Sequence, residues 1–90
     1  VSLKEASFDT TDIDFRGRIV PTPVLSGRFV DHATVMATLL GGAGNTSPTS
    51  RGVAPGVRLA ASSFERLLPD TLPDLRRWGV SVQNHSYGVD

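Results

Sequence analysis

Few side chains in this sequence could perform acid–base chemistry: it has two histidines and nine carboxylates, and cysteine is absent. His32 is the foremost candidate, because it follows Asp31 where a segment with helical apolar spacing begins. The backbone of a first helical turn is rigid, and the helix dipole there disfavours a permanently charged imidazolium. Both properties suit a general base. A surface or capping histidine is the alternative interpretation.

A short helix is expected to position His32. Residues 32–40 carry an apolar face with the small Ala33 and Ala37 between its members, which are Val35, Met36, Leu39 and Leu40. Asp31 is expected to be the N-cap, and Gly41-Gly42 is expected to end the helix in a left-handed conformation. His32 would then lie in the first turn.

Two strands and a second helix are predicted further along. Residues 57–64 become apolar and small, as in a buried strand, and residues 80–84 form another strand. Between them, Asp70 or Thr71 can cap a helix that contains Pro73 in its first turn and ends at Gly79. Its apolar face would be Leu72, Leu75 and Trp78. The order loop–helix–strand–helix–strand indicates an α/β fold with a right-handed parallel crossover.

The segment before these elements is polar. Residues 3–7, with the sequence LKEAS, are too polar to be predicted as a central buried strand. Residues 18–20 could form a short strand that stops at Pro21 and Pro23.

Length and charge narrow the function classes. Ninety residues indicate one small domain or a piece of a larger one. Nine Lys/Arg against nine Asp/Glu give a formal net charge of zero, which argues against a nucleic-acid or anionic-membrane surface. No apolar run approaches the ~18 residues of a membrane span.

Four segments carry a family resemblance. They are Ile13-Asp14-Phe15-Arg16-Gly17-Arg18-Ile19, the DHATVMATLL segment of residues 31–40, the RGVAPGVRL segment of residues 51–59, and Asn84-His85-Ser86-Tyr87-Gly88. In this order they resemble the subtilisin-like serine peptidases. The second segment is similar to the catalytic-histidine block of that family, although Ala33, Val35 and Thr38 depart from its pattern.

The resemblance implies that residues 1–90 are part of a subtilase catalytic domain with a three-layer fold around a parallel sheet. It implies that His32 is the general base of a Ser-His-Asp triad, and that Ser86, Tyr87 and Gly88 line the peptide-binding cleft. A peptide or protein substrate, the remainder of the catalytic domain, secretion and the absence of a cofactor follow from the same likeness. No part of residues 1–90 resembles the segment that carries the nucleophilic serine of this family. This chain alone is therefore expected to be inactive.

The carboxylate partner of His32 is left open by the sequence. Asp9 is one candidate, and an aspartate before Val1 is the other, while Asp14 is expected to be a structural acceptor in a loop. A different class of function also stays open, namely a non-catalytic α/β docking or binding module on the same scaffold.

Metal chemistry has little support in the sequence. No carboxylate occurs between Asp31 and Glu65, so the pattern contains no ligand cluster. Asn45 lies in a loop where some subtilases bind calcium, which makes it the one candidate that the resemblance suggests. We predict no metal site.

Overall fold

The computed structural model describes residues 1–23, 30–63 and 70–86. Its helices and strands are β1 (Ser2–Glu5), β2 (Ile19–Val20), α1 (Asp31–Gly41), β3 (Leu59–Ser63), α2 (Leu72–Trp78) and β4 (Gln83–Asn84), with short 3₁₀ helices η1 (Ile13–Phe15) and η2 (Pro48–Ser50). The strands form one parallel sheet in the order β2-β3-β1-β4. The protein is therefore an α/β domain, as predicted.

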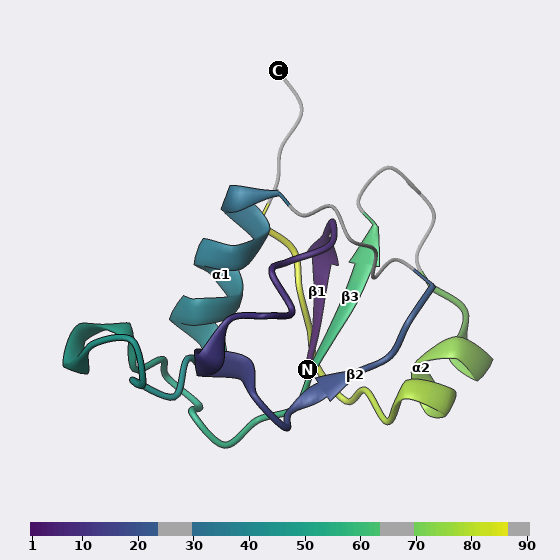
Figure 1. Cartoon of the computed structure of the whole chain (residues 1–90). Coiled ribbons are helices and arrows are strands. Elements are labelled where there is room, and N and C mark those ends of the chain that lie inside the picture. The colour runs from purple at the N-terminus through teal and green to yellow at the C-terminus, as the bar shows by residue number, and fades with distance from the viewer. Residues whose placement is uncertain (24–29, 64–69, 87–90) are drawn as a thin grey trace.

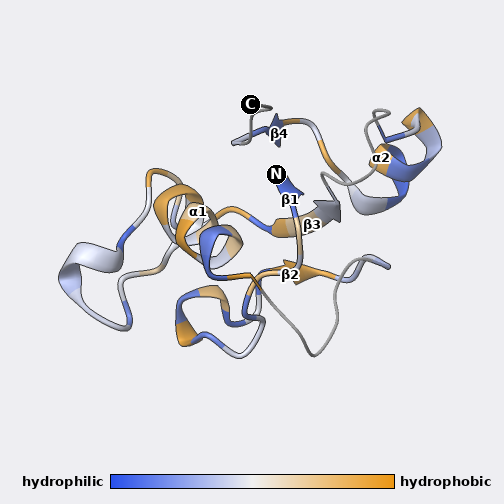
Figure 2. Ribbon diagram, turned by 90° about the horizontal axis from the view of Figure 1, so that it is seen from above, coloured by the Kyte–Doolittle hydropathy of each residue, from blue (hydrophilic) through white to orange (hydrophobic). Residues whose placement is uncertain are grey.

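The two helices lie on opposite sides of this sheet (Figures 1 and 2). All strands point the same way, and α1 begins near their carboxyl ends and runs back toward their amino ends (Figure 1). Parallel strands with helices on the faces are typical of α/β domains, whose sites form at the carboxyl edge of the sheet.

The apolar core lies between the sheet and α1. Its buried members are Leu3, Phe8, Phe15, Ala33, Ala37, Leu59 and Ala61. The rings of Phe8 and Phe15 meet edge to face, with centroids 5.4 Å apart. This arrangement covers the start of β1 with apolar side chains and leaves its carboxyl end for polar ones.

The helix α1 packs through a stripe that differs from the predicted one. Ala33, Ala37 and Gly41 are buried, whereas Val35 and Leu39 are 51% and 59% exposed. Small residues at i and i+4 spacing let the helix approach the sheet closely, so that the larger residues flank the contact.

The ends of α1 also differ from the prediction. Asp31 is its first helical residue, and the N-cap Val30 makes no side-chain capping bond. Gly42 has a φ of −60°, so the helix does not stop in a left-handed conformation. Instead, backbone N–H groups of the following loop donate to its last carbonyls: Gly52 to Gly42, Val53 to Leu39 and Ala54 to Leu40, at 2.7–3.0 Å. The loop thus replaces a local C-cap.

The expectation for residues 3–7 is wrong. Strand β1 lies between β3 and β4, and all four of its residues are buried. Leu3 and Glu5 face α1, because side chains alternate along a strand, while Ser2 and Lys4 face the other side of the sheet. Buried charges are tolerated where partners compensate them. Glu5 and Lys4 each lie against one such partner, described below, while Lys4 Nζ and Glu5 Oε1 have no hydrogen-bond partner among the described residues.

The connection from β3 through α2 to the parallel strand β4 agrees with the prediction. Strands β3 and β4 are parallel members of one sheet, and α2 connects them. The Thr71 side chain caps α2 by accepting a hydrogen bond from the Asp74 N–H, and Gly79 ends it with a φ of 67°. The predicted apolar face of α2 is not buried: Leu72 is 58% exposed. Strand β4 is shorter than the predicted residues 80–84.

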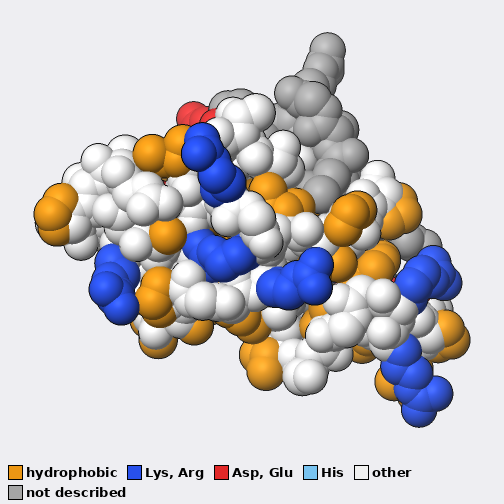
Figure 3. All heavy atoms as spheres, turned by 60° about the horizontal axis from the view of Figure 1, so that its bottom comes forward, with side chains coloured by type: hydrophobic (Ala, Val, Ile, Leu, Met, Phe, Trp, Pro, Cys, Tyr) orange, Lys and Arg blue, Asp and Glu red, His pale blue; other side chains and the backbone are white. Residues whose placement is uncertain are grey.

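Basic side chains gather at the amino ends of the strands. Figure 3 shows this face, on which Lys and Arg side chains are spread and acidic ones are almost absent. The exposed Arg16 and Arg58 precede β2 and β3, and the exposed Arg76 and Arg77 lie in the last turn of α2. Within residues 1–23, 30–63 and 70–86, no helix is long and apolar enough to cross a membrane.

Candidate functional site

A histidine and a carboxylate meet at the carboxyl edge of the sheet. Glu5 is the last residue of β1, and His32 is the second residue of α1. The Nδ1 atom of His32 lies 2.7 Å from Oε2 of Glu5, across 27 residues of sequence. The fold brings them together because β1 ends where α1 begins.

The two partners differ sharply in exposure. The Glu5 side chain is 6% exposed, whereas the His32 side chain is 54% exposed. A carboxylate that accepts a hydrogen bond from Nδ1 holds the imidazole in the tautomer whose Nε2 is the acceptor nitrogen. Among the described residues, the second oxygen of Glu5, Oε1, is buried without a hydrogen-bond partner. The pair therefore holds the exposed imidazole in one orientation at the surface, through its contact with Glu5.

Asp9 has a different role from the one considered for it. Its Oδ1 accepts hydrogen bonds from the Thr11 backbone N–H, at 3.0 Å, and from the Thr11 hydroxyl, at 2.6 Å. This is a local turn of the kind that aspartate often forms. The carboxylate on His32 is that of Glu5, which the sequence interpretation missed because it placed residues 3–7 outside the sheet.

The predicted cleft residues are only partly described. Ser86 follows β4, and its Oγ accepts a hydrogen bond of 2.6 Å from the Asn84 side chain. Strand β4 pairs with β1 in parallel, with Leu3 opposite Asn84, so Ser86 follows at the same edge of the sheet as Glu5. Tyr87 and Gly88 lie outside the described residues.

Asp14 is the structural acceptor that the sequence predicted. Its buried Oδ1 accepts the backbone N–H groups of Asn45, at 2.6 Å, and of Thr46, at 3.1 Å. Burial alone would raise the pKa of Asp14, but the hydrogen bonds from Ser50, Thr46 and Asn45 outweigh it and hold this pKa below its ordinary value. The carboxylate thus fixes the loop after α1.

Asn45, the calcium candidate of the sequence, lies in the loop after α1. The side-chain amide of Asn45 donates a hydrogen bond of 3.0 Å to the Ile13 carbonyl, so this side chain is engaged within the protein. The part of the chain that the structure describes holds no group of three or more His, Cys, Asp or Glu side chains that could bind a metal ion.

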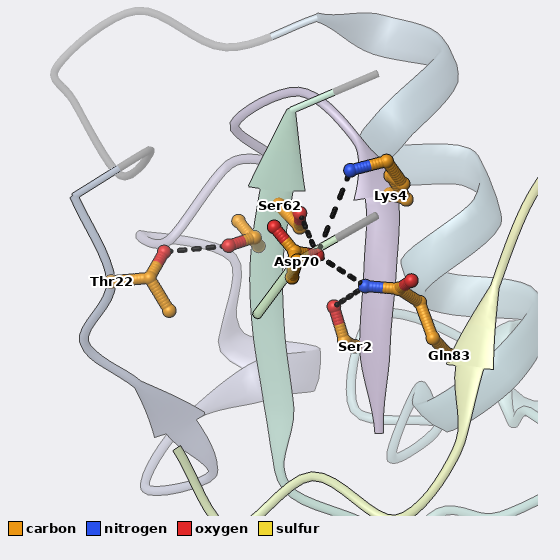
Figure 4. Close-up of polar contacts among 7 residues, drawn as sticks. Ser2, Lys4, Thr22, Ser62, Asp70 and Gln83 are labelled. Carbon is orange, nitrogen blue, oxygen red and sulfur yellow. Dashed lines mark hydrogen bonds and ion pairs between the residues drawn. The ribbon is translucent and has the colours of Figure 1, made fainter. Parts of the chain in front are cut away.

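A second polar cluster lies on the opposite face of the sheet (Figure 4). Oδ2 of Asp70 accepts hydrogen bonds of 2.7 Å from Ser62 and from Gln83, and it lies 3.6 Å from the ammonium of Lys4. The side-chain amide of Gln83 also donates a hydrogen bond of 3.1 Å to the Ser2 hydroxyl. The cluster joins β1, β3 and β4 to the residue before the cap of α2.

Asp70 is negatively charged in this cluster. Burial would raise the pKa of Asp70, but hydrogen bonds from Ser62 and Gln83 and the charge of Lys4 hold it below the ordinary value of 3.8. The side chains of Lys4 and Asp70 are 1% and 4% exposed. The cluster is buried, and we assign it a structural role.

Comparisons with known proteins do not identify the chain: no family model, no curated protein and no solved structure matches it. Function is therefore inferred from the residues and their geometry.

Proposed function

We propose that this chain is part of the catalytic domain of a subtilisin-like serine endopeptidase, in which His32 is the general base and Glu5 is the carboxylate that orients it. The observation that carries the proposal is the 2.7 Å contact between His32 Nδ1 and Glu5 Oε2 at the carboxyl edge of a parallel sheet. The four segments that resemble this family support it independently.

In such a pair the carboxylate orients the imidazole at Nδ1, and the proton is taken up and released at Nε2. Nε2 of His32 would take the proton of a serine hydroxyl as the serine oxygen attacks the peptide carbonyl, and would then give the proton to the leaving amine. The buried Glu5 stabilises the imidazolium that forms between these steps. The serine and the oxyanion donors would belong to the remainder of the catalytic domain.

A glutamate replaces the family's aspartate in this proposal. Triads with either carboxylate occur in the α/β-hydrolases, an unrelated fold, because the role needs an acceptor on Nδ1 and not a particular chain length. Two other departures are also accommodated. Ala33 is buried in the core and Val35 is 51% exposed, so neither side chain comes between Glu5 and His32.

The substrate class follows from the edge at which the pair lies. We propose that residues 86–88 bind an extended peptide by adding its backbone to the sheet, which is a common mode of peptide recognition. The position of Ser86 directly after β4, at the same edge of the sheet as Glu5, supports this. Secretion belongs to the same proposal and has no separate support.

The test uses the complete protein and a peptide substrate. His32→Ala is expected to abolish turnover, and Glu5→Gln is expected to lower kcat by about 10²–10⁴, because the amide no longer stabilises the imidazolium. Asp9→Asn is the matched control, since Asp9 contacts Thr11 and not His32. Its kcat should stay within about twofold of wild type.

The outcomes separate the alternatives. Labelling of the wild-type protein by a fluorophosphonate, lost in His32→Ala, would support the peptidase. No labelling together with intact peptide binding would favour the non-catalytic docking module. A large loss in Asp9→Asn with none in Glu5→Gln would overturn the role given to Glu5.

A further inference from the structure

Three contacts join the end of β1 and the residues after it to the start of α1. Besides the contact of Glu5 with His32, the Val30 N–H donates to the Ser7 carbonyl at 3.0 Å. The Asp9 N–H donates to Oγ1 of Thr34 at 2.9 Å, across 25 residues of sequence. Two tethers thus link the residues that follow Glu5 to the start of α1, which carries His32.

The first turn of α1 depends on these tethers for its position. Its N-cap Val30 supplies no side-chain capping bond, so that no capping side chain fixes the start of α1. The His32 ring is more than half exposed. Packing around the ring therefore contributes little to its placement, and the position of the helical backbone decides where the ring lies.

Thr34 behaves differently from the threonine one turn later. The Thr38 hydroxyl donates to the Thr34 carbonyl within the helix at 2.9 Å, which is the usual bond of a helical threonine. The Thr34 hydroxyl instead accepts from a backbone N–H outside the helix. A bond of this kind limits sliding or rotation of α1 against the end of β1, which the bond of Thr38 cannot do.

We propose that Thr34 is a positioning residue for the pair of Glu5 and His32. Its hydroxyl, held by the Asp9 N–H, fixes the first turn of α1 over the carboxyl end of β1 and so keeps Nδ1 within hydrogen-bond distance of Oε2. This inference rests on the proposed function for its consequence in catalysis, while the geometric part can be measured without turnover.

The test compares Thr34→Val with wild type in the complete protein. The valine keeps the branched shape and removes the hydroxyl. We expect kcat to fall about five- to tenfold, which corresponds to the loss of one hydrogen bond, with KM within about twofold. The downfield proton resonance of His32 Nδ1–H should broaden or disappear, and Thr34→Ser should restore both kcat and the resonance.

Thr38→Val is the matched control, because it also removes one hydroxyl from α1 but no tether between elements. It should leave kcat and the resonance unchanged, even where thermal unfolding shows a similar loss of stability. Thr34→Ala serves as a second removal of the hydroxyl if the valine variant does not fold.

Two failures can be told apart. If Thr34→Val leaves kcat and the resonance unchanged while His32→Ala and Glu5→Gln are inactive, the positioning role is wrong and the proposed function stands. If His32→Ala keeps normal turnover, the proposed function is wrong, and the resonance alone then decides whether Thr34 holds the contact. Equal effects of Thr34→Val and Thr38→Val would also overturn the inference.

Discussion

Lys4 and Glu5 are adjacent in β1, and both carry buried charges, but they serve opposite faces of the sheet. Glu5 lies against His32 at 2.7 Å, and Lys4 lies 3.6 Å from Asp70. Desolvating a charge is costly unless a partner compensates it. One short strand thus holds the orienting carboxylate on one side and a structural ion pair on the other.

Replacing Asp70 tests the second of these pairs. Asp70→Asn should lower the free energy of unfolding at pH 7 by about 3–5 kcal/mol, because Lys4 stays buried without its counter-charge. Asp74→Asn is the control, since Asp74 pairs with the exposed Arg77 at 3.3 Å and such pairs contribute about 0–1 kcal/mol. Urea denaturation of both variants gives the comparison, and equal losses would contradict the assignment.

The same variant has a predicted pH dependence. The folded pKa of Asp70 lies below its ordinary 3.8, so the unfolded chain binds more protons at acid pH and the stabilisation requires the charged form. The gap between wild type and Asp70→Asn should be complete above about pH 4–5 and should close as the pH falls through the folded pKa. Urea midpoints measured from pH 7 to pH 2 test this, and a gap that persists at the acid end would contradict it.

At the scale of elements, the loop of residues 50–54 holds the end of α1 through a close approach of backbones. A Cβ on Gly52 would lie 2.6 Å from the Thr38 carbonyl oxygen and 2.7 Å from the Gly41 nitrogen. Both contacts are to backbone atoms, which cannot move aside as a flexible side chain can. Gly52, the first glycine of the GVAPG segment (residues 52–56), is therefore required where the loop meets the helix.

Gly52→Ala should destabilise the protein by about 1–3 kcal/mol or more, because the added methyl group forces the loop away from the helix carbonyls. Gly56→Ala is the matched control in the same loop, since a Cβ there meets nothing within 4 Å. Thermal unfolding of the two variants measures the difference. A Tm of Gly52→Ala as high as that of Gly56→Ala would show that the loop yields without cost.

Elements with local signals could be predicted from the sequence, and those stabilised by distant partners could not. The cap of α2 at Thr71 and its stop at Gly79 follow from neighbouring residues, and the structure confirms both. Strand β1 was missed because its polar residues suggest exposure, while Asp70 and His32, which compensate its charges, are far away in the sequence. The same omission hid Glu5 from the candidate site.

For the whole molecule, the formal net charge of zero conceals an uneven distribution. Exposed arginines occupy the amino ends of the strands (Figure 3), whereas Glu5 and Asp70 are buried at other positions in the fold. A formal charge count alone therefore underestimates how strongly one face attracts anions.

We expect the protein to bind a cation exchanger at pH 7 and low salt, despite its formal neutrality. Arg16→Gln combined with Arg58→Gln should elute at a lower salt concentration, because both side chains are exposed and no ion pair to either is present among the described residues. Arg77→Gln is the control, since Arg77 is exposed but its charge is already paired with Asp74 at 3.3 Å. Passage of the wild type through the column without retention would contradict the prediction.

The central position of β1 has a consequence for the order in which the chain acquires its structure. Its sheet partners are β3 and β4, which come much later in the sequence. Ordered pairing of such distant segments is slow, because the chain entropy is lost before the contacts compensate it. During synthesis β1 leaves the ribosome before β3 and β4 and remains without these sheet partners until β3 follows. Glu5 and Lys4 are therefore buried between their neighbouring strands only after β3 and β4 have been made.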